Sequence, residues 1–280
     1  MEVDCAGCAA CCIDWRPLDR QAHTPIGDTT ALDERMNLVP LSSDDIRALV
    51  REGYGDVFRP RLWRPSDDQP SVCIDEVELV AIAGKPVFSV GLRQLRKPVA
   101  PFGQPSQSLR TCVFLDPSSL QCRIHESPAY PSACATYPGH HLLLAVESEC
   151  ERVEKRWETP KIIDDSVPPD IALPQLGVQA LGSTVFLHPD PDRLSGVIER
   201  LSSETLSDDD RREFVAVAMS QSPGMPHVDD ARYHNARKKL KHTTSWVSAT
   251  AIEREGATEE TSSSVTSLEL SHGAPKTPGW

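Results

Sequence analysis

Residues 5–12 of the chain read Cys5-Ala6-Gly7-Cys8-Ala9-Ala10-Cys11-Cys12, and this cysteine-rich segment is the strongest signal in the sequence. Two cysteines separated by two residues place their sulfurs on one turn, where both can reach a metal ion at about 2.3 Å. Gly7 makes such a tight turn sterically easy. The small side chains between the cysteines offer little apolar surface for a core. The segment therefore predicts a metal site rather than a group of buried, inert thiols.

The N-terminal cysteines alone do not complete a metal site, because one ion usually needs four ligands. Cys11 and Cys12 are adjacent, so we expect them to point in different directions, one ligating and the other packing or serving a second metal. The missing ligand must come from further along the chain, from Cys112, Cys122 or Cys134. Convergence of these segments on one ion would fasten distant parts of the chain together.

The other two cysteines, Cys73 and Cys150, are isolated in apolar surroundings, and we interpret them as buried thiols. A disulfide framework is disfavoured because the nine cysteines are an odd number and the N-terminus has no secretory signal. We therefore expect a cytoplasmic protein with reduced thiols. His140 and His141 could supply an imidazole ligand or a proton shuttle, although a surface or half-buried pair is the simpler interpretation.

The charge balance limits the classes of partner. The chain has 280 residues and a net charge of −12, with 41 acidic against 29 basic side chains. Such a balance repels a phosphate backbone and disfavours nucleic-acid binding. The basic run at residues 237–242 is interpreted as a solvated helix end. No apolar run is long enough to cross a membrane. A protein partner is compatible with the sequence, and the oligomeric state stays open.

Local patterns predict short elements joined by proline-rich turns. Ser42 to Asp45 should cap a helix that ends at Gly53, and the β-branched residues between Val77 and Val90 suggest a hairpin turning at Gly84-Lys85. Two short strands are expected at 111–115 and 121–125. Further helices are expected at 147–157, 190–203 and 207–220.

These patterns predict an α+β fold: a small, loop-rich, metal-stapled cysteine domain with short antiparallel strands and helices. We expect this domain to cover residues 1–160, followed by a helical accessory region at 161–242 and a linker at 164–169. Residues 243–280 are rich in Ser, Thr, Glu, Gly and Pro. They should be a disordered acidic tail, because they cannot bury enough apolar surface to offset their ordering entropy.

Four cysteine motifs, taken together and in order, resemble the CxxCxxCC zinc- or iron-chelating cysteine-cluster family of the YkgJ type. The motifs are Cys5-x-x-Cys8-x-x-Cys11-Cys12, Cys112-Val113-Phe114-Leu115-Asp116, Cys122-Arg123-Ile124-His125-Glu126 and Cys134-x-x-Tyr137-Pro138. The resemblance covers about residues 1–140, and one branch of the family is the flagellin lysine methylases. It implies metal ligands at Cys5, Cys8, Cys11 or Cys12, Cys122 and Cys134, with Cys112 adjacent. The family's arginines around the last cysteine are replaced here by Tyr130-Pro131 and Ala135, which puts any anion-binding role of those arginines in doubt.

The resemblance and the residues predict a metal-binding protein of unknown reaction, and whether it is an enzyme stays open. The cofactor would be zinc or iron, a 4Fe–4S cluster included, because both accept four thiolates. Six or more thiols exceed the need of one tetrahedral zinc, which favours iron slightly. Two alternatives remain: a structural zinc module for protein interaction, and a protein methyltransferase related to the flagellin lysine methylases.

Overall fold

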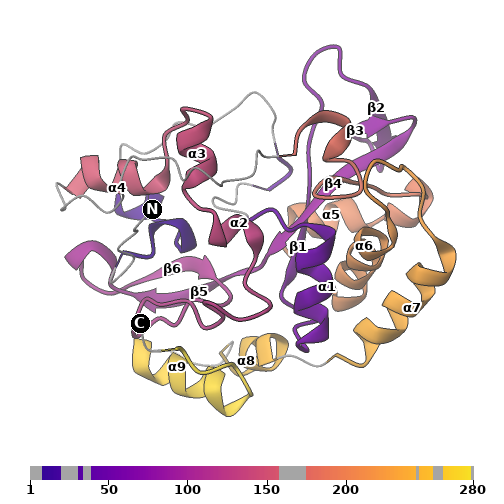
Figure 1. Cartoon of the computed structure of the whole chain (residues 1–280). Helices are drawn as coiled ribbons and strands as arrows, with labels where there is room; N and C mark the ends of the chain where they lie inside the picture. The colour runs from indigo at the N-terminus through magenta and orange to yellow at the C-terminus, as the bar shows by residue number, and fades with distance from the viewer. Residues whose placement is uncertain are drawn as a thin grey trace. The chain divides into compact units, whose positions relative to one another are not determined.

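The computed structural model describes residues 8–19, 31–33, 39–157, 175–243, 246–254 and 261–278. The chain divides into two units that interleave in sequence (Figure 1). Unit 1 comprises Met1–His23, Arg93–Pro174 and Ser245–Trp280, and unit 2 comprises Thr24–Leu92 and Gln175–Thr244. Both contain helices and antiparallel strands. The architecture is thus α+β with short antiparallel strands, as the sequence predicts.

Unit 2 is built around a sheet with the strand order β1-β4-β3-β2, in which β7 also pairs with β4. The predicted hairpin is confirmed: β3 (Val77–Ile82) and β4 (Lys85–Leu92) flank a two-residue turn. Ala83 and Gly84 both have positive φ, 50° and 73°, which is the backbone conformation that joins two strands most tightly. The remaining strands are β1 (Phe58–Leu62), β2 (Ser71–Ile74) and β7 (Phe186–Leu187).

The helices of unit 2 begin at side-chain caps that the sequence shows in advance. Ser42 and Ser207 each accept a hydrogen bond from the amide three residues later and form capping boxes that start α1 (Ser43–Arg51) and α6 (Asp208–Ser220). Helix α6 packs on α1, β1, β4 and α7. The sequence predicted α1 and α6 well. The other described helices of this unit are α5 (Val197–Ser202), α7 (Asp230–Lys241) and the short η4 (Gly177–Gln179) and η5 (Pro191–Leu194).

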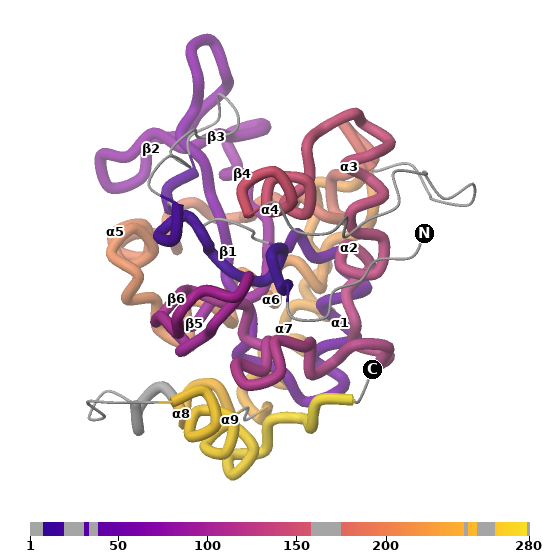
Figure 2. Tube along the Cα trace, turned by 90° about the vertical axis from the view of Figure 1, so that its left-hand side faces the viewer, coloured from indigo at the N-terminus to yellow at the C-terminus, as the bar shows by residue number. Residues whose placement is uncertain are grey.

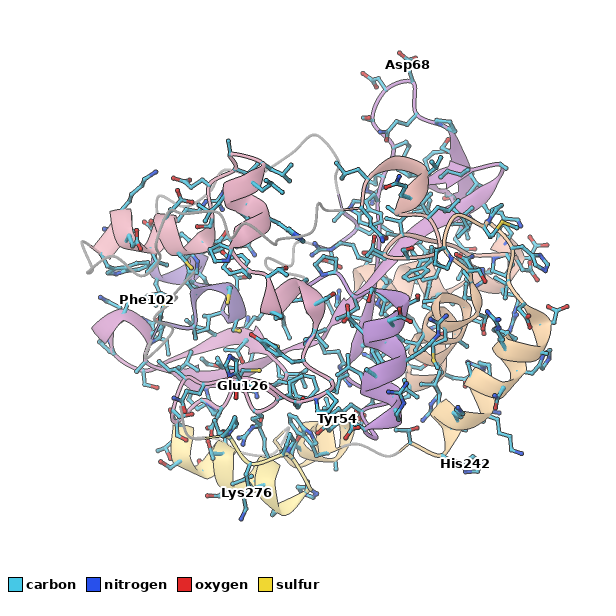
Figure 3. The ribbon with its side chains drawn as sticks, in the orientation of Figure 1. Tyr54, Asp68, Phe102, Glu126, His242 and Lys276 are labelled. Atoms are coloured by element: carbon cyan, nitrogen blue, oxygen red, sulfur yellow. The ribbon has the colours of Figure 1, made fainter. Side chains whose placement is uncertain are left out.

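Unit 1 has a two-stranded ladder of β5 (Gln94–Val99) and β6 (Gln107–Cys112) at its centre. The N-terminal segment attaches to β6, because Ile13 bridges Thr111 and the Asp14 amide donates to the Arg110 carbonyl at 2.7 Å. The short helices around this ladder are η1 (Ala10–Cys12), η2 (Arg16–Leu18), η3 (Pro101–Gly103), α2 (Ser132–Ala135), α3 (Gly139–Leu143) and α4 (Glu149–Trp157). Helix α4 packs on η1. The ring of Phe102, which Figure 3 labels, lies against that of Trp157 with centroids 4.5 Å apart.

The structure contradicts the disordered tail that was predicted for residues 243–280. Within the described part of residues 243–280, α8 (Trp246–Arg254) and α9 (Ser262–Ser271) are helical, and they lie side by side (Figure 2). Helix α9 also contacts β5. The prediction was wrong because composition does not show the buried ion pairs that hold this segment.

The predicted domain boundaries also differ from the observed division. Residues 58–92 form the sheet of unit 2 rather than part of a cysteine domain ending at residue 160, and residues 175–243 pack with that sheet rather than forming a separate helical region. The predicted linker at 164–169 lies outside the described residues. The predicted strand pair at 111–115 and 121–125 reduces to the end of β6 at Cys112 and one bridge between Leu115 and Cys122. Two turns interrupt it, closed by the amides of Leu115 and His125 on the carbonyls of Cys112 and Cys122.

Candidate thiol site

The N-terminal turn brings two cysteine sulfurs together. Helix η1 begins after Ala9, which has a φ of 51°, and the Cys12 amide donates to the Ala9 carbonyl at 2.8 Å. The sulfurs of Cys11 and Cys12 lie 3.8 Å apart, although we expected adjacent cysteines to point in different directions. The tight 3-10 turn brings the two side chains together where a regular helix or a strand would separate them.

Cys112, at the end of β6, meets this pair. Its thiol lies close enough to Cys12 for each to shift the pKa of the other, although the two residues lie far apart in the sequence. The interaction with Cys12, with the backbone amides of Phe114 and Leu115 and the charge of Lys97, lowers the pKa of Cys112 against the effect of its burial. The interaction with Cys12 likewise lowers the pKa of Cys11, while Cys12 has its pKa raised well above the ordinary value by both partners. Among these three, Cys11 and Cys112 therefore carry negative charge more readily than Cys12.

Cys122 repeats the local arrangement of Cys112. The amides of Ile124 and His125, two and three residues ahead, act to lower the pKa of the Cys122 thiol, as those of Phe114 and Leu115 do for Cys112. The amides of His125 and Leu115 also donate to the carbonyls of Cys122 and Cys112, at 3.3 and 3.0 Å. Such amide pairs direct partial positive charge at a sulfur and favour its thiolate. Burial, with the nearby Cys112 and Cys11, nevertheless raises the pKa of Cys122 to about 12. The loop that carries Cys122 ends at Glu126, which has a φ of 59° (Figure 3).

Tyr130 connects these sulfurs with Cys134. Burial raises the pKa of the Tyr130 phenol, and the neighbouring Cys134, Cys122, Cys12 and Cys11 raise it further. Cys134 lies on α2 and is half-buried. The described residues thus place Cys11, Cys12, Cys112, Cys122 and Cys134 around one region of unit 1, where the sequence predicted convergence.

The remaining cysteines differ from one another. Cys8 is buried, and Cys5 lies outside the described residues. Cys150 is buried on α4, as expected. Cys73 is exposed on β2 of unit 2, so the expectation of a buried thiol is wrong there. The alternating strand turns its side chain to solvent.

The histidines that follow α2 lie beside Tyr137. His141 makes an edge-on ring contact with Tyr137 at 5.1 Å between centroids, and its Nδ1 is buried and has no hydrogen-bond partner among the described residues. Burial lowers the pKa of His141, which favours the neutral ring. A neutral imidazole can accept a proton or a metal, so His141 keeps both roles that the sequence suggested.

The spacing of the sulfurs fits part of a metal site. Two sulfurs bound to one tetrahedral zinc at about 2.3 Å lie about 3.8 Å apart, which is the separation of Cys11 and Cys12. Among the described residues, however, no group of three or more Cys, His, Asp or Glu side chains is arranged to hold a metal ion. The donor chemistry fits a thiolate-bound metal. The metal-stapled character of the domain stays a prediction.

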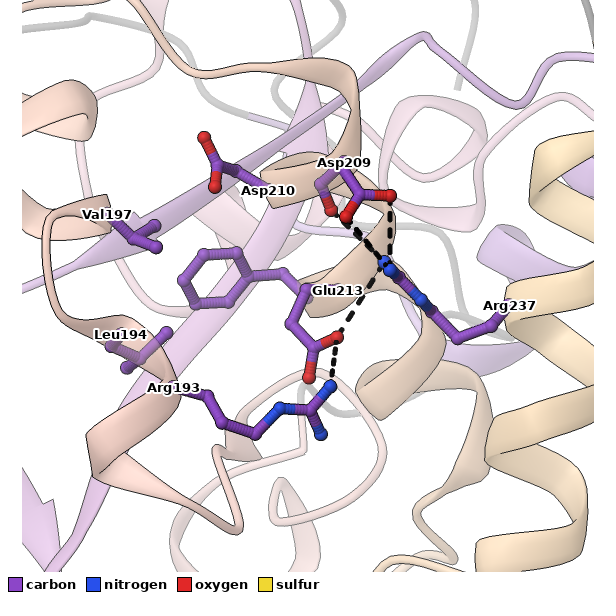
Figure 4. A pocket seen from close by; sticks show the side chains of 8 residues that line it. Arg193, Leu194, Val197, Asp209, Asp210, Glu213 and Arg237 are labelled. Atoms are coloured by element: carbon purple, nitrogen blue, oxygen red, sulfur yellow. Dashed lines mark hydrogen bonds and ion pairs between the residues drawn. The ribbon is translucent and has the colours of Figure 1, made fainter.

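A second group of charged residues lines a pocket in unit 2, and sequence reasoning missed it (Figure 4). The Glu213 carboxylate accepts from Tyr233 at 2.6 Å and from Arg193 at 3.0 Å, and Arg237 lies 3.7 Å away. Although burial raises the pKa of Glu213, the His188 ring at 3.5 Å, the hydrogen bond from Tyr233 and the charge of Arg193 hold it below its ordinary value. Because Arg237 also pairs with Asp209 at 3.1 Å, the charges around the pocket compensate one another. No single sequence motif signals this group, whose members come from separate elements.

The fold and these sites define an α+β protein with a converging set of thiols in one of its two units. The chain belongs to a family of unknown function, DUF7531, whose model matches residues 1–280. No curated protein and no solved structure matches it significantly. None of the helices in the described segments combines the length and apolar character needed to cross a bilayer.

Proposed function

We propose that unit 1 is a metal-binding module in which the thiolates of Cys11, Cys12, Cys112 and Cys122 hold zinc or iron, iron in the form of a cluster included. Cys5, Cys8 and Cys134 are the alternative ligands, any of which could replace one of these four. The observation that carries the proposal is the 3.8 Å approach of the Cys11 and Cys12 sulfurs in the N-terminal turn, together with the Cys112 thiol at the end of β6, which lies close enough to shift the pKa of both.

The local electrostatics support the same proposal. The amide pairs that point at the sulfurs of Cys112 and Cys122 and the ammonium group of Lys97, which lowers the pKa of Cys112, would stabilise thiolates in a buried place. A metal bound there would supply the positive charge that several close thiolates need. Two such turns facing one N-terminal turn would provide ligands from three segments.

The number of thiolates bears on the role of the metal. Four protein thiolates leave no open coordination position, which is typical of structural zinc and of electron-carrying iron–sulfur clusters. A site of this kind would contribute directly to the folding free energy of unit 1. A cytoplasmic address would suit it, because reduced thiols are then available.

The test is elemental analysis of the protein purified without oxygen, with its visible spectrum. We expect stoichiometric zinc in a colourless sample or iron in a brown one. In the variant Cys112→Ser most of the metal should be lost, because serine is a poor ligand for either metal, whereas Cys73→Ser, which alters an exposed thiol of unit 2, should keep it. A wild-type protein that binds neither metal after anaerobic reconstitution contradicts the proposal. Equal metal contents in folded Cys112→Ser and wild type would also contradict it.

A further inference from the structure

A buried carboxylate on the C-terminal helix joins two cations that lie beside the thiol site. The Glu269 side chain, on α9, is 1% exposed. One of its oxygens lies 2.8 Å from the Lys97 ammonium, and the other lies 2.9 Å from the Arg123 guanidinium. Both cations are themselves fully buried. Glu269 therefore connects strand β5, which carries Lys97, with the loop that carries Cys122.

Lys97 fixes the turn that follows Cys112. Its ammonium donates to the carbonyls of Val113 and Leu115 at 2.9 and 2.7 Å. These residues belong to the turn whose amides point at the Cys112 sulfur. Glu269 balances the buried charge of Lys97, so the position of this turn depends on a residue of the C-terminal helix.

Arg123 holds the second turn, which carries Cys122, in a similar way. It is the neighbour of Cys122 in the chain, and besides Glu269 it donates to the Pro275 carbonyl at 3.1 Å. Its guanidinium also lies 3.7 Å from Asp116. The C-terminal segment thus holds Arg123 by two groups, one on α9 and one beyond its end.

Asp116 provides a second attachment between the thiol loop and the C-terminal segment. Its carboxylate accepts hydrogen bonds from the hydroxyls of Thr266 and Thr277, both at 2.6 Å, and from Ser118 at 2.8 Å. The loop between the two cysteine turns is therefore anchored at its middle as well as at both ends.

We propose that Glu269 is a positioning residue for the thiol site: by pairing with Lys97 and Arg123 it fixes the separation of the Cys112 and Cys122 turns, and so it sets how firmly the site retains its metal. This inference rests on the proposed function. It assigns the C-terminal segment a role in metal retention, although that segment contributes no ligand.

The test compares metal release from the purified full-length protein with Glu269→Gln and a matched control, Glu78→Gln, which alters an exposed glutamate of unit 2. Wild type and variants are loaded with zinc, and the transfer of zinc to a chromogenic chelator is timed. Groups outside the ligand set that orient metal ligands typically contribute about 10- to 100-fold to metal affinity. We therefore expect Glu269→Gln to release zinc at least about 10-fold faster, and the control to release it at the wild-type rate.

Cobalt spectroscopy and a milder variant complete the test. In the cobalt(II)-substituted protein, a shift of the visible bands in Glu269→Gln would report altered ligand geometry, which a loss of stability elsewhere would not produce. Should Glu269→Gln fail to fold, the milder Thr277→Val removes one hydrogen bond to Asp116 and should release zinc measurably faster. Unchanged release and unchanged cobalt bands in the folded variants overturn the inference while wild type still binds metal. A wild type without metal overturns the proposed function instead.

Discussion

In unit 2 the rings of Phe88, Phe186 and Phe214 meet at the centre of the sheet, whereas unit 1 buries Lys97, Arg123 and Glu269 beside its cysteines. The Phe88 ring lies 5.6 Å from that of Phe186 and 5.0 Å from that of Phe214. Apolar contacts of this kind do not depend strongly on direction. The ion pairs of unit 1 stabilise only while each partner stays in place, because a lone buried charge is costly.

This difference shows why the two units respond to different perturbations. Unit 2 gains stability from rings contributed by β4, β7 and α6, all within one unit and without a ligand. Unit 1 depends on a helix from the end of the chain, and Trp246 on α8 places its ring 5.5 Å from the Lys97 ammonium. Removing one partner in unit 1 should therefore alter metal binding at the thiols, whereas a cavity in unit 2 should leave metal binding unchanged.

The largest effect is expected from a cavity in the aromatic centre of unit 2. Phe88 is fully buried, and Phe→Ala substitutions in cores typically cost about 3–5 kcal/mol. Phe88→Ala should lower the free energy of unfolding by that amount, measured by urea unfolding, with faster amide exchange in β1 and β4. The metal content of the folded variant should equal that of wild type. A parallel loss of metal would contradict the contrast between the units, because it would show that the thiol site depends on the core of unit 2.

A similar but somewhat smaller effect is expected when a buried charge of unit 1 loses its partner. Lys97→Met keeps much of the side-chain volume but leaves the Val113 and Leu115 carbonyls without their donor and removes one cation from Glu269. Breaking a buried pair in this way costs about 3 kcal/mol. Urea unfolding should show this loss, while Lys238→Met, which changes an exposed lysine of α7, should change stability by less than about 0.5 kcal/mol. Equal stabilities of Lys97→Met and wild type would show that the network adds nothing to unit 1.

Local signals in the sequence were enough to predict much of unit 2. Ser42 and Ser207 have short side chains that cap helices, and the structure places both at helix starts. The hairpin at Gly84 follows from β-branched strands around a residue that tolerates positive φ. In unit 1, the helix predicted at 147–157 is observed as α4 from Glu149 to Trp157.

Long-range pairing could not be predicted from the same signals. Strand β5 extends to Val99 and pairs with β6, which begins at Gln107, and no local pattern indicates this pairing. Glu269 is a polar residue in a Ser/Thr-rich segment, and composition does not show its ion pairs with buried cations or the bonds of Thr266 and Thr277 to Asp116. For the site, the cysteine motifs predicted a shared centre, which stays a prediction. The amides and Lys97 beside the sulfurs could be found only from the path of the backbone.

The last and weakest effect is a pH dependence in unit 2, which tests a partly exposed ion pair instead of a fully buried one. Asp210 closes the capping box of α6 with Ser207 and receives two hydrogen bonds from Arg200, at 2.8 and 2.7 Å. The Arg200 bonds, with those from Ser207, lower the pKa of Asp210 from its ordinary 3.8 to about 2 despite some burial. The unfolded chain therefore takes up this proton at a higher pH than the folded chain does.

The sign of the effect follows from that order of protonation. The contribution of Asp210 is fully present above about pH 4 and is lost as the pH falls towards about 2. Because the Arg200 side chain is 41% exposed, solvent screening should limit the contribution to about 0.5–1 kcal/mol. Asp210→Asn should thus be less stable than wild type at pH 6 by this amount in urea unfolding, and the difference should shrink as the pH approaches 2. Asp67→Asn, an exposed turn residue, serves as the control, and a difference that stays constant down to pH 2 would mean that the charge of Asp210 does not stabilise α6.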